Sequence, residues 1–246
     1  MSGVAGGVRS RILHPHLEVR HVRGGVELRV DGTLASSNRY GGSVTGVVWW
    51  ALAAPILLLP PGRRRTLLLG LGAGSVARAI RELAPRTKVV GVEHDDEILR
   101  LARRHFDLDG LGLEVVSGCA LEYLRRDRRS FDLIVEDLFV GSLRSVRKPD
   151  WLLAEGYDLV RKRLRPGGLL VSNTIHETRE VVGALGPFAG RVLSLDVRGH
   201  WNRIVVCGRD LPPARKVRAD LEGVPALGGV IAKLGVRSLR SGSSVT

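Results

Sequence analysis

A glycine-rich turn and one acidic side chain have the spacing of a nucleoside-binding site. Glycines occupy positions 70, 72 and 74, and Glu93 lies 21 residues beyond Gly72 (93 − 72 = 21). In dinucleotide-type folds an acid at this distance accepts hydrogen bonds from ribose hydroxyls. Glycine allows a sharp turn and lets a ligand approach where a Cβ atom would collide. The spacing predicts a nucleoside site, with helix capping as the alternative role for Glu93.

A second acid, Asp137, follows the apolar run 133–135 and Glu136, so that the segment ends in two acids. Open α/β sheets bind their ligands at the carboxyl edge of the strands, which is where an acid at the end of such a run would lie. The alternative is that Asp137 only caps a loop at that edge. We therefore treat Asp137 as a candidate functional residue.

The segments around these residues alternate between apolar strands and helical patterns, which predicts a mostly parallel sheet covered on both faces. We expect strands at 67–69, 88–93, 113–116, 131–137 and 169–173, and helices at 76–83, 95–102, 120–125, 151–164 and 177–186. Two further strands, 192–197 and 203–206, are separated by so few residues that they must pair antiparallel.

The two ends of the chain have a different pattern. After a loose lead-in (1–16), strands at 17–22, 26–30 and 33–36 are joined by glycine turns, which predicts a three-stranded antiparallel sheet. A helix is expected at 40–54 and another near 226–239. We divide the chain into a small β-sheet plus helix (1–60), a nucleoside-binding domain (61–210) and a basic C-terminal tail (211–246).

Charge and composition indicate which kinds of partner the protein could bind. The net charge is +13, and only five of the 38 basic residues are lysine. Such a charge attracts polyanions, but the basic residues are spread along the chain without the interleaved aromatics that stack bases. Nucleic acid is therefore a partner that the sequence allows but does not favour. No histidine or cysteine cluster has metal-ligand spacing, so no metal is expected.

The sequence favours a cytoplasmic protein. The N-terminus lacks the long apolar core of a signal peptide. The apolar run 47–59 contains Pro55 and is shorter than the roughly 20 residues that span a bilayer. That run could instead pair two subunits as a homodimer. The two cysteines are far apart in the sequence, which suits a reducing compartment. The four tryptophans are expected in a core or an interface.

Over residues 17–208 the sequence resembles the spermidine synthase (aminopropyltransferase) family, within the class I S-adenosylmethionine-dependent transferases. Four motifs carry the resemblance: Val30-Asp31-Gly32, the turn 70–76, Val92-Glu93 and the segment 134–137. The resemblance implies a Rossmann-like class I methyltransferase fold. That fold has a mostly parallel seven-stranded sheet with a C-terminal antiparallel hairpin, preceded here by a small N-terminal β-hairpin domain.

The resemblance also implies roles for individual residues. Glu93 would hold both ribose hydroxyls of S-adenosylmethionine or its decarboxylated form. Asp137 would be the catalytic acid that positions and deprotonates an attacking small-molecule amine, since an ammonium ion is not a nucleophile. The residues implied in donor binding are Gly70, Gly72, Ala73, Gly74, Ser75, Glu93, His94, Gly118, Cys119 and Ala120.

Three functions remain open at this point. The first is transfer of an aminopropyl group to an amine. The second is methyl transfer from S-adenosylmethionine itself, because this chain has Ser75, Cys119 and Val140 where the resemblance implies acids. An uncharged Ser75 would not repel the carboxylate of that donor. The third is a relative that binds a nucleoside or a polyanion without turnover.

Overall fold

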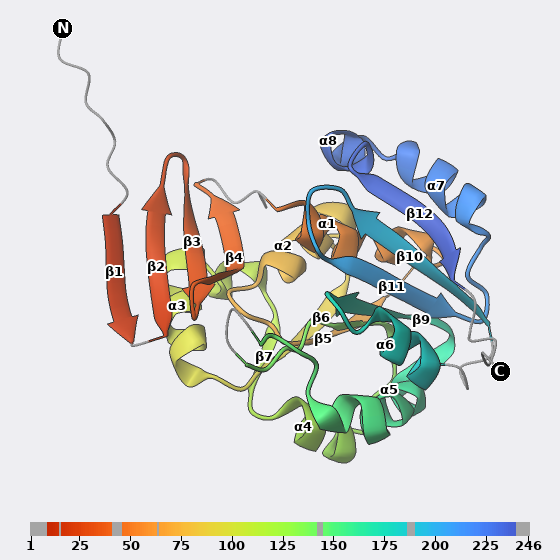
Figure 1. The fold of residues 1–246 in the computed structure, drawn as a ribbon, viewed down its shortest axis with the longest axis horizontal. Helices are drawn as coiled ribbons and strands as arrows, with labels where there is room; N and C mark the ends of the chain where they lie inside the picture. Colours follow the sequence, from red (N-terminus) through yellow and green to blue (C-terminus); the bar gives the residue numbers. More distant parts are fainter. Residues whose placement is uncertain are drawn as a thin grey trace, which may run out of the picture.

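A computed structural model describes residues 9–14, 16–40, 46–62, 64–141, 145–185 and 190–239, and in it two sheets lie side by side (Figure 1). The smaller sheet is antiparallel, with strands in the order β1-β2-β3-β4. Its strands are β1 (Arg9–His14), β2 (Leu17–Val22), β3 (Gly25–Val30) and β4 (Thr33–Arg39).

The larger sheet has eight strands in the order β12-β10-β11-β9-β8-β5-β6-β7. Strands β7, β6, β5, β8 and β9 run parallel to one another, whereas β11 pairs antiparallel with β9 and β10 and β12 continue the sheet antiparallel. These strands are β5 (Arg65–Leu69), β6 (Lys88–Glu93), β7 (Glu114–Ser117), β8 (Phe131–Glu136), β9 (Leu164–Thr174), β10 (Arg191–Val197), β11 (Arg203–Gly208) and β12 (Leu234–Leu239).

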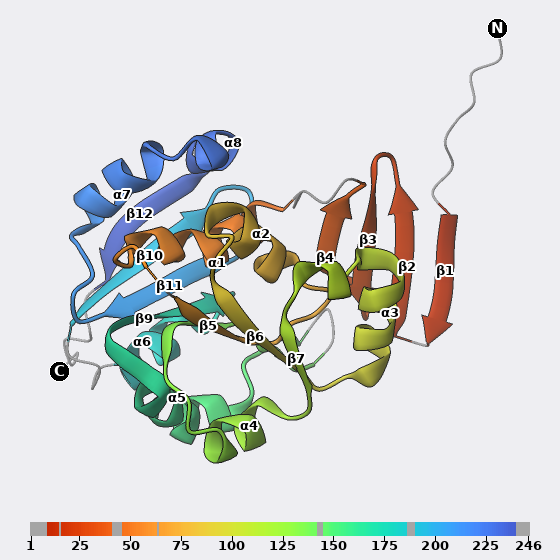
Figure 2. The ribbon, with the colours of Figure 1, turned by 180° about the vertical axis from the view of Figure 1, so that it is seen from behind.

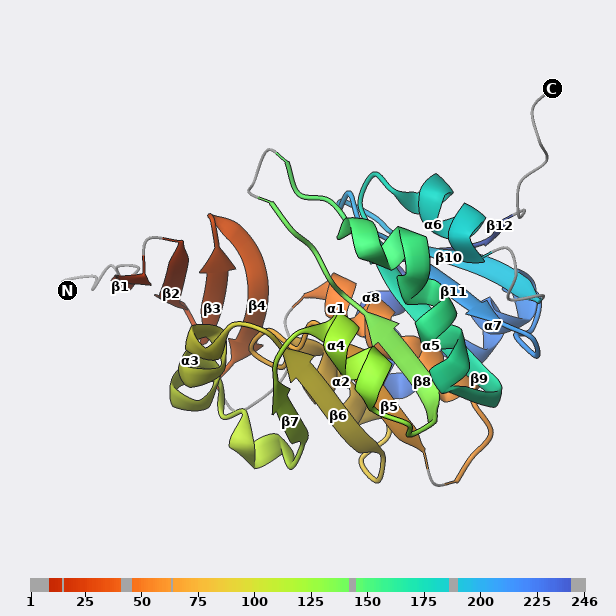
Figure 3. The same ribbon diagram turned by 90° about the horizontal axis from the view of Figure 1, so that it is seen from below.

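Helices cover both faces of this sheet (Figures 2 and 3). Side chains of α1, α2, α3, α7 and α8 join one core cluster, and those of α4, α5 and α6 join the other. The helices are α1 (Val47–Ala53), α2 (Ser75–Leu83), α3 (Asp96–Phe106), α4 (Ala120–Arg126), α5 (Tyr157–Arg163), α6 (Thr178–Leu185), α7 (Ala214–Glu222) and α8 (Gly228–Ile231).

The central strand β5 contributes side chains to the core cluster on each face of the large sheet. Leu67 and Leu69 point into one core cluster and Leu68 into the other, and all three are buried. A strand buried on both faces reads as a continuous apolar run, so the Rossmann-like prediction is confirmed. Asp95 caps α3 by accepting hydrogen bonds from the amides of Glu97 and Ile98 (2.8 and 3.2 Å).

The structure corrects several element predictions. Residues 9–14, predicted as a loose lead-in, form β1, so the small sheet has four strands instead of three. The predicted helix near 226–239 is wrong: it is replaced by a 3-10 turn (Pro225–Leu227), the short α8 and strand β12. Because β12 pairs with β10, the large sheet has eight strands instead of seven.

The helix predicted at 40–54 is shorter than expected. Helix α1 starts at Val47 and continues as a 3-10 turn (Ala54–Leu58), while residues 41–45 lie outside the described residues. Trp49, Trp50 and Ile56 are buried in the core of this chain. Much of the run 47–59 therefore packs within this chain, and the homodimer stays a prediction.

Candidate functional site

The glycine turn connects β5 to α2 and is held against two neighbouring strands. The amides of Gly70 and Leu71 both donate to the carbonyl of Val92 at the end of β6 (3.0 Å each). Gly70 has a φ of +85°, and a Cβ atom there would lie 2.5 Å from the carbonyl oxygen of Asp137. Both its conformation and its close approach to Asp137 therefore require glycine.

The amides of the turn already have partners within the protein. The Gly72 amide donates to Glu93 Oε2 (2.8 Å), the Ala73 amide to Ser36 Oγ (3.0 Å) and the Gly74 amide to the Leu71 carbonyl (3.0 Å). Diphosphate groups of dinucleotides bind to free amides at such turns. With these three amides occupied, the turn suits a nucleoside without phosphates better than a dinucleotide.

The small sheet is attached to the same turn through β4. Besides the bond from Ala73 to Ser36, the amide of Ser37 donates to Ser75 Oγ (3.1 Å). Ser36, Ser37 and Ser75 are all buried. The Ser75 hydroxyl therefore faces β4, and the small sheet closes one side of the candidate donor site.

Glu93 ends β6 with a buried carboxylate that faces the turn. Its Oε1 accepts hydrogen bonds from the amides of His94 and Asp95 (2.9 and 3.2 Å), and its Oε2 accepts from Gly72. Burial alone would raise the pKa of Glu93, but the hydrogen bonds from His94, Gly72 and Asp95 outweigh it and lower the pKa. An ionised acceptor at this position can receive ribose hydroxyls at Oε2.

His94 is exposed, and its Nδ1 lies 3.1 Å from Glu93 Oε1. This hydrogen bond is the main cause that raises the pKa of His94 above 6.5. On the other side of Glu93, the Gly118 amide donates to the Glu93 carbonyl (2.8 Å), which brings the start of α4 to the site. Cys119 is a free, exposed thiol there, and Ala120 is buried.

Asp137 follows β8 on the same edge of the sheet. Its amide donates to the Leu69 carbonyl (2.9 Å), and its Oδ1 accepts from Asn173 Nδ2 (2.7 Å). Burial raises the pKa of Asp137, while the hydrogen bond from Asn173 and the charge of Lys148 only partly oppose this effect. Asp137 is thus a carboxyl whose affinity for a proton is enhanced, next to a glycine turn.

A buried ion pair that the sequence analysis missed lies directly behind Asp137. Lys148 Nζ contacts Glu136 Oε1 at 2.6 Å, and both side chains are fully buried. Glu136 Oε2 also accepts from Ser172 Oγ (2.6 Å) and from Tyr157 OH (3.3 Å). Lys148 Nζ additionally donates to the Leu138 carbonyl (3.1 Å). The pair therefore fixes the start and the end of the segment 138–148 beside the site.

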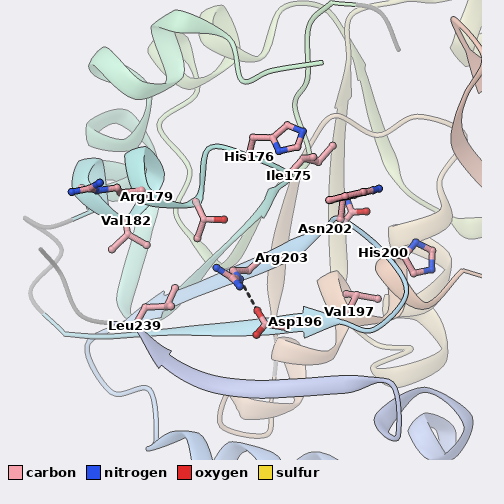
Figure 4. A pocket seen from close by; sticks show the side chains of 13 residues that line it. Ile175, His176, Arg179, Val182, Asp196, Val197, His200, Asn202, Arg203 and Leu239 are labelled. Carbon is pink, nitrogen blue, oxygen red and sulfur yellow. Dashed lines mark hydrogen bonds and ion pairs between the residues drawn. The ribbon is translucent and has the colours of Figure 1, made fainter. Parts of the chain in front are cut away.

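A cavity of about 740 Å³ lies at the carboxyl end of β9 (Figure 4). Its lining includes Asn202, whose Nδ2 donates to Asn173 Oδ1 (3.0 Å). Because Asn173 in turn donates to Asp137, two hydrogen bonds connect the cavity to Asp137. Trp201, expected in a core or an interface, lies outside the core of this chain, where it is 83% exposed and lines this cavity.

The described parts of the chain hold neither a metal-ligand cluster nor a membrane-spanning helix. No group of three or more histidine, cysteine, aspartate or glutamate side chains is placed to hold a metal ion among these residues. In the same residues, the helices are too short or too polar for a membrane span.

Comparisons with known proteins show which families this chain resembles. The family model described as a methyltransferase domain matches residues 67–168. The polyamine aminopropyltransferase of Chromobacterium violaceum is 31% identical over 173 residues, which cover 65% of this chain and 65% of that protein. The corresponding protein of Neisseria meningitidis serogroup A is 29% identical over 156 residues, covering 61% of this chain and 58% of that protein. The chain thus spans less than two thirds of these curated relatives.

Solved structures show the same fold. A probable spermidine synthase from Corynebacterium glutamicum has a TM-score of 0.69 at 20% identity, covering 96% of this chain and 91% of that chain. Human methyltransferase-like protein 13, in complex with SAH, has a TM-score of 0.58 at 20% identity, covering 76% of this chain and 90% of that one. The resemblance to the spermidine synthase family is therefore confirmed in sequence by curated polyamine aminopropyltransferases and in fold by spermidine synthases.

Proposed function

We propose that this protein transfers an aminopropyl group from decarboxylated S-adenosylmethionine to an amine. The observation that carries the proposal is the pair of acids at one edge of the sheet. Hydrogen bonds lower the pKa of Glu93, whereas burial raises the pKa of Asp137. Two acids with opposite shifts are suited to different tasks, one to bind as an anion and the other to exchange a proton.

Donor binding would depend on Glu93 and the glycine turn. The ribose hydroxyls would donate to the ionised Glu93 carboxylate, which the amide of Gly72 already orients. The adenine side of the donor would lie toward Gly118 and Cys119, which the bond to the Glu93 carbonyl places next to the ribose position. The sulfur end of the donor would lie near Asp137, whose backbone closely approaches Gly70.

In the transfer step the amine nitrogen forms a bond to the aminopropyl carbon attached to sulfur. The carbon–sulfur bond breaks, and its electron pair stays on sulfur, so the sulfonium becomes the neutral thioether of methylthioadenosine. The proton that the nitrogen must lose passes to the Asp137 carboxylate. The raised pKa of Asp137 favours this uptake.

Methyl transfer from S-adenosylmethionine is the second candidate. Two observations favour it: the match to a methyltransferase domain over residues 67–168, and the lack of any acid in the turn from Gly70 to Ser75. Without an acid there, the donor carboxylate meets no negative side chain in the turn. Its product would be S-adenosylhomocysteine in place of methylthioadenosine.

Calorimetric titration with both donors and with methylthioadenosine tests the proposal. We expect the decarboxylated donor to bind more tightly than S-adenosylmethionine. Glu93→Ala should weaken binding of all three by about tenfold or more, because each hydrogen bond to a charged group contributes about 1.5–3 kcal/mol. Glu82→Ala, which removes an exposed acid of α2, is the matched control and should change nothing.

The other outcomes are equally informative. Tighter binding of S-adenosylmethionine would overturn the aminopropyl proposal in favour of methyl transfer. Binding of none of the three would contradict a nucleoside site at Glu93. Binding without any turnover of an amine would support a non-catalytic relative.

A further inference from the structure

A cavity is linked to Asp137 through Asn202 and Asn173, and its charges differ from those expected of a polycation channel. We propose that the cavity of about 740 Å³ is the acceptor subsite and that it takes an amine that also carries a carboxylate or similar anionic group. The inference rests on the proposed function, since it names the acceptor class for that transfer.

The charges that line the cavity are mostly positive. Arg179 and Arg203 line it together with a single acid, Asp196. Asp196 Oδ1 is 2.7 Å from Arg203 Nε, and its Oδ2 is 3.3 Å from Arg237 Nε. Two arginines thus compensate the one acid (Figure 4 shows the contact with Arg203).

Arg179 remains as an uncompensated charge. Its side chain is exposed at the start of α6 and makes no ion pair with any residue that the structure describes. The nearby Glu177 does not neutralise it by pairing, because its carboxylate accepts from the amides of Lys148, Ile175 and His176 (3.1, 3.2 and 3.1 Å). An anionic group would be attracted to Arg179, whereas a polyamine would meet like charge.

Aromatic and imidazole rings complete the lining. Trp201 is 83% exposed, and its ring centroid is 6.4 Å from that of His176. His200 lies on the same loop and also lines the cavity. An exposed tryptophan offers a flat apolar face on which the carbon chain of an acceptor can pack.

Two hydrogen bonds between side chains link this cavity to Asp137. Asn202 lines the cavity and donates to Asn173 Oδ1 (3.0 Å), and Asn173 donates to Asp137 Oδ1 (2.7 Å). An ionised carboxylate can only accept a hydrogen bond, so Asn173 must turn its NH₂ group toward Asp137 and its oxygen toward Asn202. The two hydrogen bonds therefore fix the orientation of both side-chain amides. The acceptor would therefore place its anionic end near Arg179 and its amine near Asp137.

The test compares acceptors that differ in one group. Putrescine is a diamine, ornithine is the same diamine with a carboxylate on one carbon, and 4-aminobutyrate keeps the carboxylate and one amine. We expect calorimetry with saturating methylthioadenosine to show that the two carboxylated compounds bind at least about tenfold more tightly than putrescine. Arg179→Gln should remove about tenfold of that affinity and leave methylthioadenosine binding unchanged, while putrescine binding should stay the same or become tighter because a like charge is removed.

Two further variants keep the test decisive. Arg161→Gln changes an exposed arginine of α5 and is the matched control for charge. Trp201→Ala should weaken all three acceptors alike, because the aromatic face does not distinguish charge. Tighter binding of putrescine, or equal effects of Arg179→Gln and Arg161→Gln, would overturn the inference.

The proposed function and this inference fail in different ways. If methylthioadenosine does not bind, the proposed function is contradicted. The preference for carboxylated amines can still be measured without nucleoside, and its loss on Arg179→Gln would support the anion site alone.

Discussion

Asp137→Asn leaves donor binding intact and lowers the transfer rate about 10²–10⁴-fold, the range that a positioned general base contributes. An amide cannot take up the proton of the attacking amine, but its oxygen can still accept from Asn173, as Asp137 Oδ1 does at 2.7 Å. Single-turnover rates with the decarboxylated donor, alongside calorimetry with methylthioadenosine, measure the two effects separately. Asp158→Asn, at an exposed acid of α5, is the control.

The direction of the Asp137 pKa shift also predicts how Asp137→Asn affects stability and how the rate of the wild type depends on pH. The pKa of Asp137 is raised in the folded protein, so its ionisation costs stability as pH rises from its unfolded pKa through the higher folded value. Asp137→Asn removes this cost, so the melting temperature should not fall at neutral pH. In the wild type, the rate should rise with pH on an acid limb above the ordinary aspartate pKa of 3.8. A fully active Asp137→Asn enzyme would contradict the catalytic assignment.

Lys148→Met is expected to cause the largest loss of stability, about 3–5 kcal/mol, because it leaves the fully buried carboxylate of Glu136 without its counter-charge. The double variant Lys148→Met, Glu136→Gln should recover part of this loss, since an amide can still accept from Ser172. Urea unfolding of both variants gives the two free energies.

Lys162→Met, at an exposed lysine of α5, is the matched control and should change stability by less than about 0.5 kcal/mol. A loss at Lys148 no larger than at Lys162 would show that the buried pair does not stabilise the fold. Equal stability of the single and double variants would show that Glu136 is not the group left unpaired.

The sequence was sufficient to predict features that depend on local patterns of residues. The apolar run at 67–69 predicts a fully buried strand and the segment 131–137 a further strand, and the structure places them in neighbouring strands β5 and β8. The spacing of Gly72 and Glu93 predicts their proximity, and their hydrogen bond is 2.8 Å long. Both predictions depend on residues close in sequence or on the regular βαβ connection.

Features that depend on tertiary partners were not predictable in the same way. Residues 226–239 have an apolar spacing that suits a helix, but the edge of β10 offers backbone hydrogen bonds, and β12 forms there. Trp201 is exposed because it lies in the turn between β10 and β11, which periodicity cannot place.

Each residue of the buried pair Glu136–Lys148 has one unusual feature that is visible in the sequence. Glu136 is a charged residue at the end of a strand buried on both faces, which implies a hidden partner. Lys148 is one of only five lysines in an arginine-rich chain. Neither observation identifies the other residue, because the described parts of the segment between them form no helix or strand that would set their relative positions. The hydrogen bonds from Asn202 through Asn173 to Asp137 gave no comparable signal.

A crystal structure of the protein soaked with methylthioadenosine tests the central claim most directly. The account predicts the ribose hydroxyls within hydrogen-bond distance of the Glu93 carboxylate and the thioether sulfur next to Asp137. A nucleoside bound elsewhere would contradict the account. So would a carboxyl edge of β5 and β6 that the protein's own side chains still fill at saturating ligand.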